Sequence, residues 1–181
     1  MSTAVNIKKA GADSDPGKSK FFGDPAVPYE WADKFYENVI FFCQIKLSDI
    51  EGFDKENRLP HTGYLYVFLD TEKYPYTPIV HYYDGEPYAV LDGFNGEVPG
   101  FTHLTQAWEM EFCDAEDGAD GNKLFGVPCD WNYEKDPPPL LLQFDPLSEN
   151  TGFMEETDGY MYLFFGKDGG LDDVTLHIEN S

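Results

Sequence analysis

Two glutamines stand inside apolar runs 99 positions apart, Gln44 in FFCQIKL and Gln143 in LLLQF. A glutamine amide offers two donors and an acceptor, so it is able to orient a bound ligand. Four further polar residues lie in comparable strand-like segments: Tyr64, Tyr66, His81 and His177. If these segments meet, Gln44, Gln143, Tyr64 and Tyr66 would line a ligand pocket between two halves of the molecule. His81 and His177 would be paired ligands in one shared site. The alternative is that the tyrosines pack in the core and the histidines lie far apart on half-exposed strands.

An acidic segment offers a second kind of site. Four carboxylates occur there without an intervening cation: Asp114, Glu116, Asp117 and Asp120. Carboxylate oxygens on a Gly-containing loop are ligands that Ca²⁺ prefers, so residues 114–122 are a candidate calcium loop. The spacing is not that of an EF-hand, because counting from Asp114 places Gly118 at the fifth position and Phe125 at the twelfth. A solvated loop without metal is the alternative.

Charge limits the partners of the chain. It has 34 Asp and Glu against 12 Lys and Arg, a formal net charge of -22, and Arg58 is its only arginine. Nucleic-acid binding needs clustered cations that neutralise phosphates, so we expect no nucleic-acid partner, whereas a basic protein would complement the charge. No stretch approaches the roughly 20 apolar residues that span a bilayer, and residues 1–20 lack the apolar centre of a signal peptide. We therefore expect a cytoplasmic protein without membrane association.

Three motifs occur twice in the same order, which indicates an internal duplication. FFGDP at 21–25 corresponds to LFGVP at 124–128, and the two glutamine segments follow. GYLYVFL at 63–69 then corresponds to GYMYLFF at 159–165. The twin glutamines are thus predicted to be one structural position that occurs twice.

The duplication predicts a domain organisation. The repeats are expected at about 21–84 and 124–181, with an inserted segment at 85–123 and a flexible N-terminal tail at 1–20. Each repeat has only about 60 residues and would be marginally stable alone, so we expect both to share one core in a single globular domain over 21–181.

The repeats have the alternating pattern of β-strands. In the first glutamine segment Phe41 and Cys43 fall on one face and Gln44 on the other, and Leu140 and Leu142 repeat this in the second. Residues 64–69 are apolar on both faces, which is typical of a strand in the middle of a covered sheet. Third strands are expected at 78–83 and 174–179.

The segments outside these strands complete the predicted fold. Residues 103–114 have the pattern of a half-buried strand, with an amphipathic helix as the alternative. Short helices are expected only around 30–38 and 48–54. The predicted fold class is therefore α+β, mainly β, with an internally duplicated antiparallel sheet and few short helices.

The motifs in their order also resemble the YwqG-like family of uncharacterised bacterial proteins. The resemblance covers roughly residues 20–181 and rests on a GDP...W entry, CQIKL, LPHTGYLYVF, LFGVPCDW, LLLQFD and DGYMYLFF. It implies a mainly β, internally duplicated fold, and it brings no established activity or catalytic residue. The acidic loops and the short C-terminus depart from the family pattern. The resemblance therefore does not imply a shared ligand.

The sequence favours a non-catalytic function. The nucleophile-elbow pattern GxSxG and the zinc-protease pattern HExxH are both absent. The leading hypothesis is a module that presents acidic loops and exposed tyrosines to a basic protein. The alternatives are a calcium-binding protein that uses 114–122, and a small-ligand binder or enzyme with a pocket between the repeats. No pattern in the sequence indicates an oligomeric state.

Overall fold

The computed structural model describes residues 1–133, 135–155 and 159–179. Its helices are single 3-10 turns: η1 (Tyr29–Trp31), η2 (Leu47–Ile50) and η3 (Asn95–Glu97). Its strands are β1 (Ser2–Lys9), β2 (Lys20–Phe21), β3 (Ala26–Val27), β4 (Val39–Lys46), β5 (Tyr64–Asp70), β6 (Thr77–Tyr83), β7 (Ala89–Val90), β8 (Trp108–Ala115), β9 (Lys123–Leu124), β10 (Leu140–Phe144), β11 (Met161–Phe164) and β12 (Thr175–Ile178). The predicted mainly β fold is confirmed, and the helices expected around 30–38 and 48–54 are reduced to η1 and η2.

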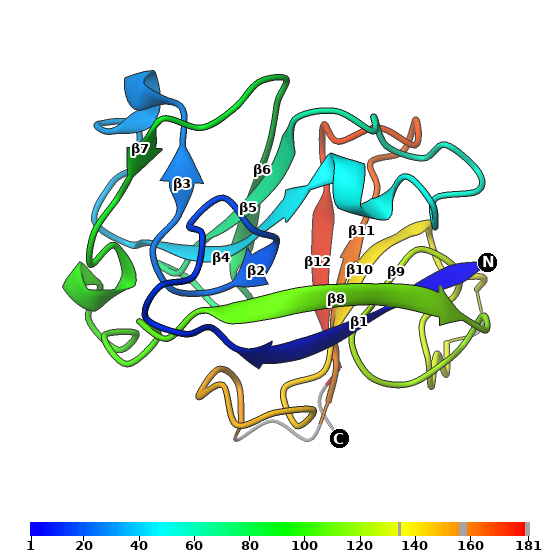
Figure 1. Cartoon of the computed structure of the whole chain (residues 1–181). Coiled ribbons are helices and arrows are strands. Elements are labelled where there is room, and N and C mark those ends of the chain that lie inside the picture. Colours follow the sequence, from blue (N-terminus) through cyan, green and yellow to red (C-terminus); the bar gives the residue numbers. More distant parts are fainter. Residues whose placement is uncertain (134, 156–158, 180–181) are drawn as a thin grey trace.

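Ten strands form one antiparallel sheet in the order β12-β11-β10-β9-β1-β8-β2-β4-β5-β6 (Figure 1). β3 and β7 form a small second sheet. At the centre of the large sheet β1 and β8 pair along their whole length. On either side of this pair the order is the same, a two-residue strand followed by three longer ones. We call β2 to β7 the first half and β9 to β12 the second half; that they arose by duplication stays a prediction.

The N-terminal segment is not the flexible tail that the sequence predicts. Ser2–Lys9 form β1, which lies in the middle of the sheet and pairs with β8 and β9. The prediction failed because β1 mixes polar and apolar residues, and its long partner strand lies in the middle of the sequence. The predicted insertion 85–123 is likewise not separate from the sheet, because it contains β8, the partner of β1. The strand prediction for 103–114 is confirmed from Trp108 onward, and the helical alternative is wrong.

A β-bulge occurs at the same place in each half. Phe42 is the extra residue of β4 opposite β5, and Leu141 is the extra residue of β10 opposite β11. Phe42 and Leu141 therefore pack in the shared core, whereas Phe41 and Leu140 face outward. The alternation that would place Phe41 on the same face as Cys43 is wrong here, because the extra residue shifts the pattern by one position.

The largest buried cluster lies between the two halves of the sheet and includes side chains from both. Phe144 of the second half packs against Phe21 and Phe42 of the first, with ring centroids 5.2 and 5.3 Å away. The edge strands β6 and β12 come close to each other across this core. Two smaller apolar clusters cover the outer faces, one in each half. The halves thus share one core, and their polar features lie on the outer faces.

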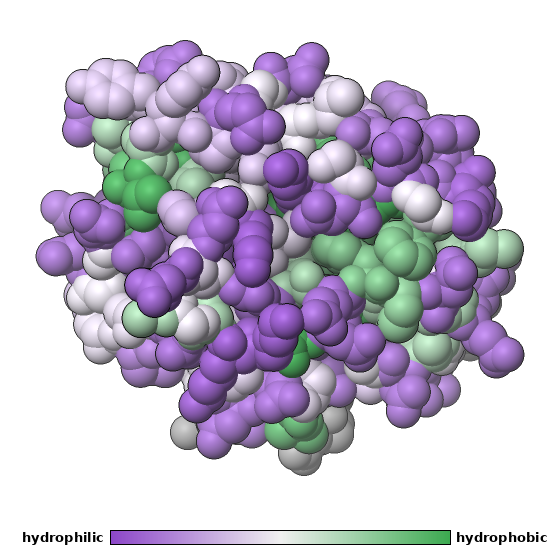
Figure 2. All heavy atoms as spheres, viewed as in Figure 1, coloured by the Kyte–Doolittle hydropathy of each residue, from purple (hydrophilic) through white to green (hydrophobic). Residues whose placement is uncertain are grey.

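The outer surface is mostly hydrophilic on the side shown in Figure 2, where hydrophobic atoms gather in separate patches. In the ranges that the structure describes, no helix combines the length and the apolar character needed to cross a membrane.

Candidate functional site

A row of the same four residue types crosses each half of the sheet. Strand pairing places a lysine, a glutamine, a tyrosine and a histidine opposite one another on neighbouring strands. The rows are Lys20, Gln44, Tyr66 and His81 in the first half, and Lys123, Gln143, Tyr162 and His177 in the second. They include every predicted ligand-binding residue except Tyr64.

Gln44 is fully buried and fixes the loops on both sides of β2. Its Oε1 accepts a hydrogen bond from the Ala26 N–H at 2.9 Å, and its Nε2 donates to the carbonyls of Pro16 and Lys18, both at 2.9 Å. The Tyr66 hydroxyl donates to the Ala26 carbonyl at 2.7 Å. Gln44 and Tyr66 together therefore hold the N–H and the carbonyl of Ala26 by hydrogen bonds.

Gln143 makes the same contacts in the second half. Its Oε1 accepts from the Cys129 N–H at 2.9 Å, and its Nε2 donates to the carbonyls of Ala119 at 3.2 Å and Gly121 at 2.7 Å. The Tyr162 hydroxyl donates to the Cys129 carbonyl at 2.6 Å. Both amide hydrogens and the amide oxygen of each glutamine are thus bonded to the chain itself, which identifies the twin glutamines as elements of the fold.

The predicted ligand pocket between the repeats is not formed by these residues. Gln44 and Gln143 lie on outer faces, each under its own loop, with the shared core between the two halves. Tyr64 and Tyr66 are buried in the outer cluster of the first half, and the Tyr64 hydroxyl donates to the Gly17 carbonyl at 2.9 Å. Burial raises the pKa of Tyr64 to about 12, so its hydroxyl remains a donor at neutral pH.

The paired histidines also lie apart. The His81 ring packs 5.2 Å from the Trp31 ring in the first half, and the His177 ring packs 5.6 Å from the Trp131 ring in the second. Burial, and secondly the charge of Lys34, lower the pKa of His81. The two histidines belong to separate aromatic clusters, so the structure does not bring them into one shared site.

The acidic loop presents its four carboxylates to solvent. The Ser2 hydroxyl donates to the Asp117 carboxylate at 3.2 Å. Within the described ranges, no three His, Cys, Asp or Glu side chains are grouped so that they could hold a metal ion. Calcium binding by Asp114, Glu116, Asp117 and Asp120 stays a prediction, and the arrangement of the described residues gives it no support.

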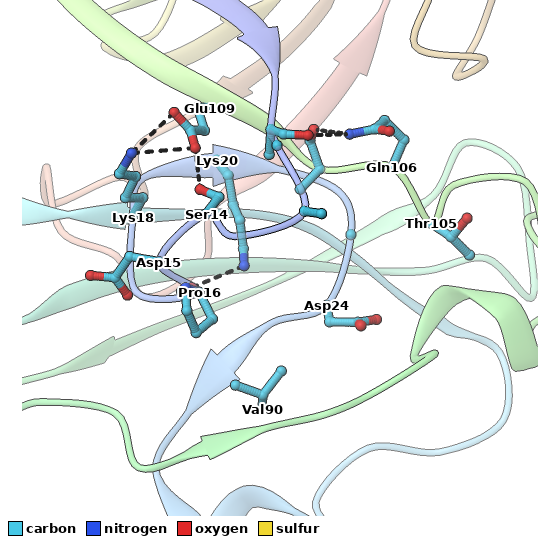
Figure 3. A pocket seen from close by; sticks show the side chains of 15 residues that line it. Ser14, Asp15, Pro16, Lys18, Lys20, Asp24, Val90, Thr105, Gln106 and Glu109 are labelled. Atoms are coloured by element: carbon cyan, nitrogen blue, oxygen red, sulfur yellow. Dashed lines mark hydrogen bonds and ion pairs between the residues drawn. The ribbon is translucent and has the colours of Figure 1, made fainter.

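A polar cavity of about 450 Å³ lies beside Lys20, where the loop after β1 passes over the sheet (Figure 3). Glu109 of β8 accepts hydrogen bonds from Lys18 at 3.3 Å and from the Ser14 hydroxyl, and Lys20 donates to the Pro16 carbonyl at 2.9 Å. Burial lowers the pKa of Lys20 to about 8. An amine that is partly neutral at physiological pH is able to act as a base or to attack a carbonyl. This cavity is not the predicted pocket between the repeats, because neither glutamine lines it.

An open aromatic cleft of about 700 Å³ lies on the outer face of the second half. Trp131 is at its centre, with ring centroids 4.6 Å from Tyr133, 5.6 Å from His177 and 5.4 Å from Phe164. The Trp131 indole N–H donates to the Lys135 carbonyl at 2.9 Å, and the Tyr133 hydroxyl and His177 Nε2 are hydrogen-bonded at 2.8 Å. These bonds orient the rings, while Tyr133 stays 49% exposed.

The corresponding place in the first half is filled by the chain itself. Trp31 lies against His81 as Trp131 lies against His177. Phe35 stacks on Phe68 with centroids 4.0 Å apart, and the Lys34 ammonium lies 4.3 Å from the centre of the Trp31 ring. Phe68 and Phe164 occupy corresponding positions of the repeated strand. The first half thus holds a ring and a cation where the second half has a cleft.

Several residues of these sites were not selected from the sequence. Lys20 and Lys123 each directly precede the first repeated motif, but lysines are usually exposed and the pattern gave no reason to place them under a loop. Trp31 and Trp131 each follow the proline of that motif, at different distances. The sequence signals that could have identified these residues were the lysine directly before each copy of the motif and the tryptophan after it.

Neither the models of known protein families nor the curated proteins that were searched match this chain. The resemblance to the YwqG-like family therefore stays a prediction, and it carries no residue roles. What the protein does has to be inferred from its own residues.

Proposed function

We propose that this protein is a non-catalytic module that binds a basic protein partner. The observation that carries this proposal is the outer face of the second half, where Tyr160 and Tyr162 connect the acidic loop to the open aromatic cleft. The loop is held on this face by Gln143 and by the Gly121 N–H, which donates to the Tyr160 hydroxyl at 3.2 Å. Tyr160 stacks beside Tyr162, and Tyr162 in turn lies 6.1 Å from Trp131.

The charge of this face differs from that of the first half. Residues 115–122 carry three acids and no cation, a net charge of -3. Residues 12–19, which make the matching bonds to Gln44, carry two acids and Lys18, a net charge of -1. Asp117 is ion-paired with the N-terminal ammonium of Met1 at 2.9 Å, which leaves Glu116 and Asp120 as the unpaired acids among residues 115–122 that the structure describes. With two such acids and no lysine, this loop attracts a cationic surface more strongly than residues 12–19 do.

The use of the polar rows also favours binding over catalysis. The amides of Gln44 and Gln143 and the hydroxyls of Tyr66 and Tyr162 bond to loop backbone. Burial also raises the pKa values of both tyrosines, which keeps the hydroxyls protonated. These groups hold the loops in place and leave recognition to the loop surfaces.

The proposal is tested with a short lysine-rich peptide, its fully acetylated form and a single-stranded DNA of equal length. Isothermal titration should show binding of the lysine peptide alone. Its affinity should fall by about tenfold or more between roughly 0.05 and 0.5 M NaCl, because exposed charges are screened. Equal affinity at both salt concentrations, or no binding of any lysine-rich peptide, would contradict the proposal.

A matched pair of charge variants locates the surface. The first removes three charges from the acidic loop: Asp114→Asn, Glu116→Gln and Asp120→Asn. The second removes three exposed charges of the first half: Glu30→Gln, Glu51→Gln and Glu72→Gln. Only the first set should weaken the lysine peptide, by about three- to tenfold. Asp117 is kept in both because of its bond to Ser2.

A further inference from the structure

The aromatic cleft has walls that suit a cation as well as an apolar group. Trp131, Tyr133 and Phe164 present ring faces or edges, and a ring face attracts an ammonium group within about 6 Å of its centre. The described residues place cations over the rings of Trp108, Trp31 and Phe165, and none over Trp131. Trp131 lines the open cleft, and among the described residues no cation lies over its ring.

The first half shows what such a cluster accommodates. There the Lys34 ammonium lies over Trp31, which packs on His81 as Trp131 packs on His177. The strand phenylalanine is contacted differently, because Phe35 stacks on Phe68 in the first half and Trp131 itself packs on Phe164 in the second. Because Phe35 and Lys34 occupy that site from within the chain, it is closed to a partner. In the second half the corresponding volume of about 700 Å³ is open.

The surroundings of the cleft add charge complementarity. Asp136 lines the cleft, and Gln143 fixes the acidic loop, residues 114–122 with four acids and no lysine or arginine, on the same outer face. Lys135 is the one cation among the lining residues that the structure describes, and its backbone is bonded to the Trp131 indole. Acidic groups around an aromatic site favour a positively charged occupant over a neutral one.

We infer that the cleft around Trp131 binds the ammonium-bearing side chain of a lysine from the partner. The inference rests on the proposed function and gives it a location and a chemistry. The ammonium of that lysine lies over the ring of Trp131, as the Lys34 ammonium lies over Trp31.

The test combines two variants with an exposed-tyrosine control. Lys135→Phe supplies a ring of the kind that Phe35 supplies in the first half, and should close the cleft. Tyr133→Ser removes one wall without touching the buried core. Tyr88→Ser is the control, because Tyr88 is 83% exposed and lies on the first half. Each of the two cleft variants should weaken a peptide with one central lysine by about 5- to 30-fold, and the control should not.

Changes in the peptide separate charge from shape. Replacing the lysine by norleucine should cause a loss as large as that of Lys135→Phe, and replacing it by trimethyl-lysine should preserve binding. Unchanged affinity in both cleft variants would overturn the inference while leaving the proposed function intact. Tighter binding of a phenylalanine peptide than of the lysine peptide would also overturn it.

A small probe tests the cleft when no peptide binds. Tetramethylammonium chloride is titrated against the full chain, and the indole N–H signal of Trp131 is followed by NMR, with Trp31 as the internal reference. A saturable shift of Trp131 that is lost in Tyr133→Ser supports the inference even if the proposed partner class is wrong. The absence of such a shift overturns it.

Discussion

The two halves of the molecule have the same internal polar framework and different surfaces. In each half a buried glutamine and a tyrosine clamp the same backbone position, Ala26 in one and Cys129 in the other, and a bulge lies two residues before the glutamine. Above this framework, the first half fills its aromatic cluster with Phe35 and Phe94, whereas the second leaves a cleft beside Trp131.

This difference separates the groups that hold the fold from those free to recognise a partner. A side chain that makes the same bonds in both halves is explained by loop positioning, which both need. A feature present in only one half, such as the cleft or the more acidic loop, is not required by the shared framework. Function is therefore better sought where the halves differ than among the repeated glutamines.

The largest expected loss of stability tests whether the hydrogen bonds of Gln44 and Gln143 contribute equally to the two halves. Gln44→Leu and Gln143→Leu each remove three hydrogen bonds, and each leaves a buried backbone N–H and two partly buried loop carbonyls without these partners. Each should lower the free energy of unfolding by roughly 3 kcal/mol or more, measured by urea denaturation. Gln106→Leu is the control, because Gln106 is exposed, and it should cost less than about 0.5 kcal/mol. A small cost at only one of the buried glutamines would show that the clamps are not equivalent.

The strands and the equivalence of the glutamines could be predicted because their signals are local. The alternation around Gln44 and the two apolar faces of β5 result from the two-residue period of a strand, and the order of the repeated motifs is enough to align the two glutamines. β1 was missed because its pairing is with the distant β8. The bulge at Phe42 was missed because it depends on the pairing with β5, which no single strand reveals.

The candidate site was harder to predict than the fold. The sequence identified Gln44 and His81 as polar residues near apolar ones, but it could not show that backbone groups of a loop would use the amide of Gln44 completely. It also could not show that Trp131 borders an open volume, because an open cleft is a property of what neighbouring segments leave uncovered. Phe35 and Tyr133 look alike as aromatic residues in loops, and only their surroundings differ.

A second prediction sharpens the contrast between the filled and the open cluster. Phe35→Ala removes the stack on Phe68 and the edge contact with Phe94, so it should lower the free energy of unfolding by about 2 kcal/mol. Tyr133→Ala removes an exposed ring and should cost less than about 1 kcal/mol. Urea denaturation of both variants gives the comparison. If both variants lowered the free energy of unfolding equally, Tyr133 would support the fold as Phe35 does. The cleft would then be part of the packed structure and not a surface free to bind a partner.

The smallest predicted effect concerns the lysines at the start of the two rows. Burial lowers the pKa of Lys20 to about 8 in the folded protein, below the value of 10.5 for the free side chain. The folded state therefore releases this proton first, and between these two pH values the unfolded state binds more protons. Stability must then rise with pH in this window, because the charged amine is the form that burial disfavours.

Comparison with Lys20→Met isolates this contribution from the other titrating groups. The wild type should gain on the order of 1 kcal/mol relative to Lys20→Met between pH 7 and pH 9, as measured by urea denaturation at each pH. Lys123→Met should show a difference of the same sign, because burial also lowers the pKa of Lys123. If only Lys123→Met shows it, water in the cavity of about 450 Å³ solvates the Lys20 ammonium, and the two rows differ at their first residue as well as at their aromatic ends.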